Sequence, residues 1–98
     1  MINRISKNEE KLDKALSSVK NLEEALYDFK SNKKNIEQLN KYYGSKEWFK
    51  DKDAYEQNKI PKVKAGVLSE DAVWNLNEDV KDLINEMRKI VGKWNNEN

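Results

Sequence analysis

Apolar residues recur every seven positions along the first part of the chain, and a second apolar series follows three residues behind the first. The two series are Ile5, Leu12, Val19 and Leu26, and then Ala15, Leu22, Phe29 and Ile36. This spacing places all of these side chains along one stripe of an α-helix. The pattern predicts a long helix over about residues 3–43, a stretch that contains no glycine or proline.

One polar run interrupts this pattern. Lys33 occupies a position that the seven-residue series reserves for an apolar side chain, and every residue from Ser31 to Asn35 is polar. We expect a bend, a frayed face or a local loss of packing there, and a complete break is the alternative. The sequence leaves open whether the helix continues from Ser31 to Asn35.

The most regular pattern in the chain follows Ser69. Its apolar residues are spaced alternately by three and four: Val73, Leu76, Val80, Leu83, Met87, Ile90 and Trp94. This spacing predicts a second long helix, over about residues 70–94, with one narrow seam of the coiled-coil kind. Ser69 is well placed to cap the start of this helix through its hydroxyl group.

An aromatic turn lies between the two long helices. Gly44 followed by Ser45 is the order favoured where one helix ends and the next begins. The stretch 46–57 is predicted to form a short helix. Asn58 is suited to the left-handed conformation that ends a helix, and the residue before Pro61 avoids helical angles, so an extended step should follow.

Two apolar seams joined by a short connector should pair in opposite directions. We therefore expect an all-α fold, an antiparallel helical hairpin that forms a single domain over residues 1–98. The first helix is the longer one, so Ile5, Leu12 and Leu16 should extend beyond their partner within the chain. Leaving each of them in water forfeits roughly 1.5–3 kcal/mol. We expect a second copy of the chain, giving a homodimer, or another helical protein to cover them.

Composition agrees with long, solvated helices. Charged residues make up 38% of the chain and hydrophobic residues 37%, with a mean hydropathy of −1.07. There is no cysteine, so disulfides and thiol chemistry are excluded. No apolar run approaches the ~20 residues needed to span a bilayer, and no signal peptide is evident at the N-terminus. We expect a cytoplasmic protein that does not enter a membrane.

The residue types present exclude most kinds of active site. Without histidine or cysteine, the usual nucleophilic triads and almost every zinc site are excluded. The run that begins Asp51-Lys52-Asp53 suggests a calcium loop, but Glu56 and Lys62 stand where that loop needs glycine and glutamate. The three glycines are isolated, so no phosphate-binding loop is expected. We expect no enzyme activity, catalytic residue, cofactor, metal site or small-molecule substrate.

Two surfaces remain as candidates for protein interaction. One is the stripe of the first helix, and the other is the aromatic turn; their candidate residues are Ile5, Leu12, Leu16 and Val19, and Lys46, Trp48, Phe49 and Lys50. The turn is also basic, because the excess of lysine is concentrated in residues 30–64. Binding to a nucleic-acid backbone is therefore an alternative function. Sequence-specific recognition is disfavoured because residues 30–64 contain no arginine, the usual reader of guanine.

Two stretches resemble the signatures of a small domain family of unknown function from Gram-positive bacteria. They are YYGSKEWF, from Tyr42 to Phe49, and GVLSEDAV, from Gly66 to Val73. The resemblance covers nearly the whole chain and implies a long helix, an aromatic turn and a C-terminal helix. Where the family pattern has a glycine and then Leu-Pro, this chain has Asn58-Lys59-Ile60-Pro61. The resemblance implies a fold and no activity.

We therefore expect a non-enzymatic bacterial protein that acts in protein–protein interaction or oligomerisation. A further alternative is the class of small helical hairpins that Gram-positive bacteria export alone or as toxin partners. The Trp-x-Gly turn of those proteins is missing here, because Gly44 precedes Trp48.

Overall fold

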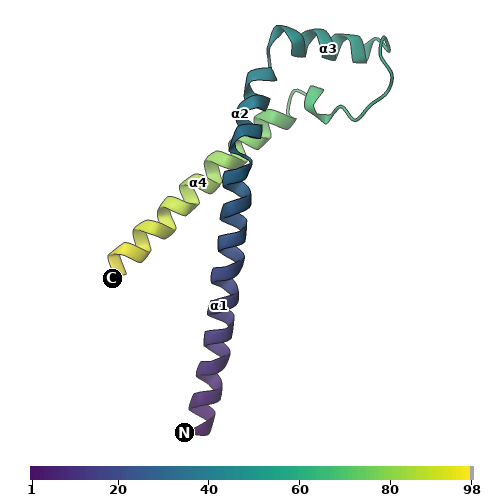
Figure 1. Ribbon diagram of the computed structural model, residues 1–98. Coiled ribbons are helices and arrows are strands. Elements are labelled where there is room, and N and C mark those ends of the chain that lie inside the picture. The colour runs from purple at the N-terminus through teal and green to yellow at the C-terminus, as the bar shows by residue number, and fades with distance from the viewer. Residues whose placement is uncertain (98) are drawn as a thin grey trace. The chain divides into compact units, whose positions relative to one another are not determined.

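The protein is α-helical throughout its regular structure. The computed structural model describes the backbone of residues 1–97 and the side chains of residues 1–95. Its elements are the helices α1 (Ile2–Ser31), α2 (Lys33–Tyr42), α3 (Lys46–Glu56) and α4 (Ala72–Glu97), with a short 3₁₀ helix η1 (Gly66–Leu68) before α4 (Figure 1). No strand occurs in residues 1–97, so the predicted all-α class is confirmed. The final residue of the predicted domain, Asn98, lies outside the described residues.

The polar run of the first helical stretch ends α1. Asn32 stands between α1 and α2 with φ −94° and ψ 2°, and its backbone N–H is shared between the carbonyls of Asp28 and Phe29. Its side-chain amide also donates to the Asp28 carbonyl, at 2.9 Å, and its side-chain oxygen accepts from Asn35 at 3.0 Å. Polar side chains that bond to nearby backbone in this way compete with the helical ladder. The predicted helix over 3–43 is therefore a bent helical stretch in which Asn32 alone separates α1 from α2, and the Ile36 N–H still bonds to the Asn32 carbonyl. The expected bend is confirmed.

Internal contacts divide the chain into two units. The first is Met1–Glu37, which contains α1. The second runs from Gln38 onward and contains the end of α2, α3, η1 and α4. We call this second unit the turn unit. Both buried hydrophobic side chains of the described residues, Trp48 and Val73, belong to the turn unit, so the core lies there.

Local chemistry sets the bounds of α3. The Ser45 hydroxyl accepts a hydrogen bond from the Trp48 N–H at 3.2 Å, which confirms the predicted cap. Gly44 precedes it with φ +78°, a conformation that costs glycine little and other residues more. At the other end Asn58 has φ 57°, which confirms the predicted left-handed terminator, and the Lys59 N–H closes the turn onto the Ala54 carbonyl. The helix spans 46–56, against a prediction of 46–57.

The start of α4 is also capped as predicted. The Ser69 hydroxyl accepts from the Ala72 N–H at 3.0 Å. Residues 70 and 71 form a turn, so α4 begins two residues later than the predicted 70 and extends to Glu97 rather than 94. The connector from Pro61 to Ala65 carries neither helix nor strand.

The chain reverses direction within the turn unit. Near the end of α2, the side-chain amides of Asn40 and Asn77 exchange hydrogen bonds of 3.1 and 2.7 Å. Three residues further along, the Tyr43 hydroxyl donates to the Glu70 carbonyl. Later residues on one side therefore meet earlier residues on the other, so residues 38–42 of α2 and the beginning of α4 run antiparallel.

Candidate functional site

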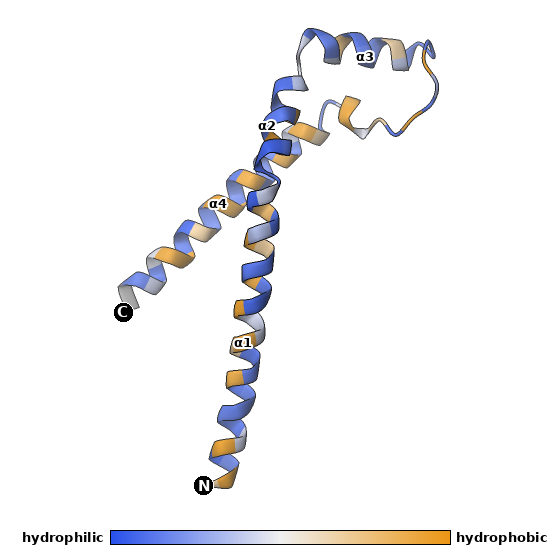
Figure 2. Ribbon diagram, viewed as in Figure 1, coloured by the Kyte–Doolittle hydropathy of each residue, from blue (hydrophilic) through white to orange (hydrophobic). Residues whose placement is uncertain are grey.

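The first candidate surface is the apolar face of α1. We define the α1 stripe as Ile5, Leu12, Leu16, Val19, Leu22 and Leu26. Each of these side chains is exposed, by between 38% and 59%, and α1 contains no buried residue. Figure 2 shows the stripe as orange bands that recur along the helix between blue, polar turns. The four candidate residues of the first surface thus lie on one accessible face.

Such exposure bears on the stability of α1. Most of the stability of helices in proteins comes from packing of an amphipathic face, and isolated helices are marginal in water. The N-terminus of α1 has no side-chain cap and no acidic residue in the first turn, so these two common sources of helix stability are missing there. The main feature that could stabilise α1 is its periodic apolar stripe. A cover over the stripe would supply the missing stabilisation.

The four residues of the second candidate surface all belong to α3, but one of them is buried and three are exposed. Trp48 is only 3% exposed, and its indole N–H donates to the Val67 carbonyl at 2.9 Å. Its ring meets the Tyr43 ring edge-on, at a centroid distance of 5.1 Å. Trp48 therefore anchors the turn and presents almost no surface to a partner. The sequence indicated that Trp48 belongs to the turn. It did not indicate the contact with Val67, which depends on how the connector folds back onto α3.

The other three turn residues are exposed on the surface of α3. Phe49 is 60% exposed and touches Trp48 only edge-on, with centroids 4.9 Å apart. Lys46 and Lys50 are exposed as well, three residues before and one residue after Phe49, and neither forms an ion pair with the side chains described, those of residues 1–95. These residues combine one aromatic ring with two available ammonium groups.

Lys52 belongs to the basic turn in sequence, but in the structure its positive charge is paired with two glutamates. Its ammonium group lies 3.2 Å from Glu56 and 3.4 Å from Glu70, and its side chain is 24% exposed. The hydrogen bond to Glu56 is the main reason that the pKa of Lys52 is raised, and the bond to Glu70 acts in the same direction. The same ammonium lies 5.8 Å from the centre of the Trp48 ring. Lys52 thus ties α3 to the turn before α4.

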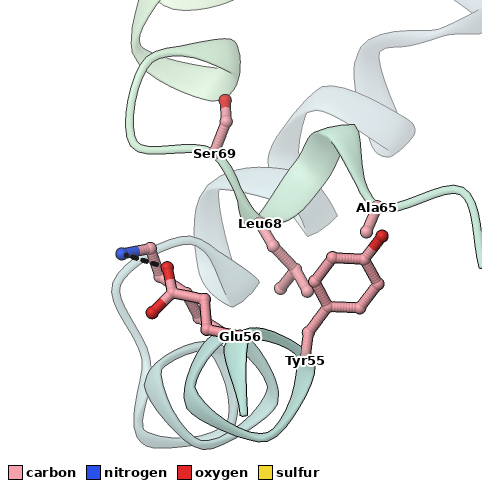
Figure 3. Close-up of a pocket in the computed structure, with 6 residues that line it drawn as sticks. Tyr55, Glu56, Ala65, Leu68 and Ser69 are labelled. Carbon is pink, nitrogen blue, oxygen red and sulfur yellow. Dashed lines mark ion pairs between the residues drawn. The ribbon is translucent and has the colours of Figure 1, made fainter. Parts of the chain in front are cut away.

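Two hollows lie between α3 and the connector. The first, of about 230 Å³, is lined by Lys52, Tyr55, Glu56, Ala65, Leu68 and Ser69. In Figure 3 the Leu68 side chain points toward the Tyr55 ring, whereas the Ser69 hydroxyl points away. The second, of about 210 Å³, shares Ala65 and Leu68 with the first. The charged groups of the first hollow are already paired with each other, so they offer little to a ligand.

The second hollow contains one short polar contact. The Tyr42 hydroxyl donates to the Asp51 carboxylate at 2.6 Å. This hydrogen bond, with smaller contributions from burial and from the charge of Asp51, raises the pKa of Tyr42 to about 12. The phenol therefore keeps its proton at a higher pH than an unperturbed tyrosine does, and it acts as a donor that joins the end of α2 to α3. It is not suited to act as a base.

Carboxylates do not converge in the described part of the chain. Among the side chains of residues 1–95, no three acidic groups come together closely enough to hold a metal ion. Asp51 and Asp53, which suggested a calcium loop, both lie within α3. The described helices also include none that is long and apolar enough to cross a bilayer.

Comparison with known proteins places both candidate surfaces within one family domain. The family described as "Domain of unknown function (DUF4298)" matches residues 5–90. No curated protein matches the chain, and no solved structure does. The matched range includes the whole α1 stripe, α3 and most of α4.

Proposed function

The chain belongs to a family of domains of unknown function, DUF4298, and from this premise we propose that it is a non-enzymatic protein-interaction module whose main binding surface is the α1 stripe. The partner is a helix from a second polypeptide chain, in the first instance another copy of this protein. A bacterial, Gram-positive origin and a cytoplasmic location complete the proposal. The observation that carries it is a helix of 30 residues with a regular apolar stripe and no buried side chain.

The periodicity of the stripe supports a helical partner. Ile5, Leu12, Val19 and Leu26 are seven residues apart, which is the repeat by which two helices remain in contact along their length. Isolated exposed hydrophobic residues are common on protein surfaces, but a contiguous series of six along one helix is a larger apolar patch. Its width suits one helix.

Nucleic-acid binding through the turn has less support. Of the aromatic and basic side chains in the turn, Trp48 is buried, Lys52 is paired with two glutamates and Lys62 lies 4.5 Å from the centre of the Tyr55 ring. Phe49, Lys46 and Lys50 remain available, so the double variant Lys46→Glu with Lys50→Glu tests this alternative. A steep loss of nucleic-acid binding with added salt, abolished in the double variant, would favour it.

The substitution Leu12→Asp tests the α1 surface directly. A charge in the middle of the stripe should weaken association by roughly ten- to a hundredfold, because it removes about 1.5–3 kcal/mol of apolar burial and places a carboxylate in the contact. Sedimentation equilibrium over a range of concentrations measures the effect. Circular dichroism at high concentration should show that helix can still form.

Ser17→Asp is the matched control. It introduces the same charge on the same helix, five residues after Leu12 and away from the stripe, so association should be unchanged. Equal behaviour of the two variants would mean that the stripe is not a binding surface. If association is unchanged in both Leu12→Asp and the double lysine variant, neither candidate surface binds a partner and the proposed function is wrong.

A further inference from the structure

The second half of α4 has an uncovered apolar face of its own. Val73 at the start of the seam is buried, and the next seam residues are half-buried. Beyond them Leu83 is 56% exposed, Ile90 51% and Trp94 69%, whereas Met87 and its neighbour Ile84 are half-buried. We define the α4 distal stripe as Leu83, Met87, Ile90 and Trp94, flanked on one edge by Ile84 and Val91. Figure 2 shows apolar bands recurring along this part of α4.

The other edge of the distal stripe carries one acid and one base. Glu86 and Lys93 each precede an a-type seam residue, Met87 and Trp94, by one position, so both lie beside the seam on the same edge. No ion pair of either residue is present in the described part of the chain. The two charges are seven residues apart, too far to meet each other on one helix.

From this arrangement we propose that the α4 distal stripe is a self-complementary surface that pairs antiparallel with the same stripe of a second copy of the chain. The register is set by Met87 of each copy meeting Ile90 of the other. Leu83 of each copy then meets Trp94 of the other, which gives four apolar layers. Ile84 meets Val91 along one edge, and Glu86 meets Lys93 along the other. Because the two copies are related by a twofold axis, each of these contacts occurs twice in the dimer.

Other alignments lose this complementarity. In a parallel pair, Glu86 of one helix would face Val91 of the other, and neither charge would find an opposite partner. An antiparallel pair shifted by one repeat toward the N-terminus would bring Glu86 against Glu86 of the second copy. The register centred between Met87 and Ile90 is the one that aligns the residues of the α4 distal stripe with one another and pairs Glu86 with Lys93.

The contact is short. Residues 83–94 span about 18 Å of helix, less than the length typical of a tight dimer interface, so the pair should dissociate on dilution. This inference concerns a different helix from the α1 stripe, and it accounts for a homodimer whether or not the α1 stripe binds a further chain.

Charge exchange in the full-length protein tests the proposal. Glu86→Lys alone places lysine against lysine, and Lys93→Glu alone places glutamate against glutamate, so each should weaken dimerisation by about tenfold. The double variant Glu86→Lys with Lys93→Glu restores both pairs with reversed polarity, and its affinity should return to within about threefold of the original. Sedimentation equilibrium measures all four proteins, with circular dichroism to confirm equal helix content.

Lys89→Glu is the matched control for these variants, because it makes the same charge change on the opposite face of α4 and should leave dimerisation unchanged. Disulfide trapping tests the orientation, since the chain has no cysteine of its own. Met87→Cys mixed with Ile90→Cys should form a covalent dimer readily. Either variant alone should do so poorly, whereas a parallel pair would link each variant to itself.

Three results would overturn the inference: a wild-type protein that stays monomeric at high concentration, a double variant as weak as the single ones, or self-linking of Ile90→Cys. The α1 proposal fails independently. If Leu12→Asp abolishes association while the charge variants have no effect, the α1 stripe is the binding surface and the α4 pairing is wrong. The opposite pattern supports α4 and removes the α1 surface.

Discussion

The α1 helix and the turn unit use the same kinds of residues in opposite ways. In α1, a regular apolar stripe runs along 30 residues without a buried side chain. In the turn unit, a few aromatic and polar groups fix Trp48 and Val73 at 3% exposure each. Periodicity thus determines which face of a helix is apolar, whereas side-chain contacts from elsewhere in the chain determine whether that face is covered. The comparison separates a turn unit that holds the buried core from long helices whose apolar faces are exposed.

The same contrast occurs within α4. Val73 and Leu83 belong to one seam, yet the first is buried and the second is 56% exposed. The buried end lies where Asn77 and Glu70 are hydrogen-bonded to the end of α2 and to Tyr43. On α4, therefore, the seam is buried only near the residues that contact the aromatic turn and the end of α2.

Removing Trp48 should have the largest effect on the turn unit. Trp48→Ala eliminates the buried ring and the hydrogen bond to Val67, which should cost about 3–5 kcal/mol. Phe49→Ala, one residue away but 60% exposed, should cost less than about 1 kcal/mol. Near-ultraviolet circular dichroism followed through thermal unfolding measures both. Equal losses would show that the distinction between a buried and an exposed face of α3 is wrong.

Removing the caps should have a smaller effect, confined to the turn unit. Ser45→Ala and Ser69→Ala each take away the acceptor for a helix N-terminal N–H and should cost about 1 kcal/mol. Ser17→Ala, in the middle of α1, should leave stability unchanged or raise it slightly, since alanine is the better helix former. Urea unfolding compares the three variants. Similar destabilisation by Ser17→Ala would contradict the different roles assigned to serine in the two regions.

The smallest effect concerns the Tyr42–Asp51 hydrogen bond at high pH. The pKa of Tyr42 is about 12 in the folded protein and near 10 when unfolded, so folding favours the protonated phenol. Its contribution to stability should be complete below pH 10 and should disappear as the pH rises through 12. Absorbance titration should show a phenol ionising near pH 12 that is absent from Tyr42→Phe and retained in Tyr27→Phe. Ionisation of all phenols together, in a folded protein, would contradict the bond.

Local signals in the sequence were sufficient for the helices and their ends. Gly44, Ser45, Asn58 and Ser69 act at short range, so their roles as terminators and caps could be predicted from neighbouring residues alone. The polar run at Ser31–Asn35 indicated an interruption, but both a bend and a break were compatible with it. The structure has a bend with a one-residue interruption at Asn32, where side-chain amides bond to the nearby backbone and to each other. It is not a complete break, because the Asn32 N–H bonds to the Asp28 carbonyl and the Ile36 N–H to the Asn32 carbonyl.

Burial within the candidate site could not be predicted in this way. Trp48 and Phe49 are adjacent aromatic residues, and the buried one is bonded to the Val67 carbonyl, 19 residues further on. Lys52 carries the same charge as Lys50 but is paired with Glu70, 18 residues away. Contacts between positions so far apart depend on the path of the connector, which residue periodicity does not specify.

Sedimentation equilibrium of the unmodified chain tests the central claim most directly. If a second chain covers the apolar stripes, the weight-average mass should rise with concentration from 11.6 kDa toward at least twice that value, and the helix content should rise with it. A mass of 11.6 kDa at every concentration, with helix content that does not change on dilution, would contradict the account.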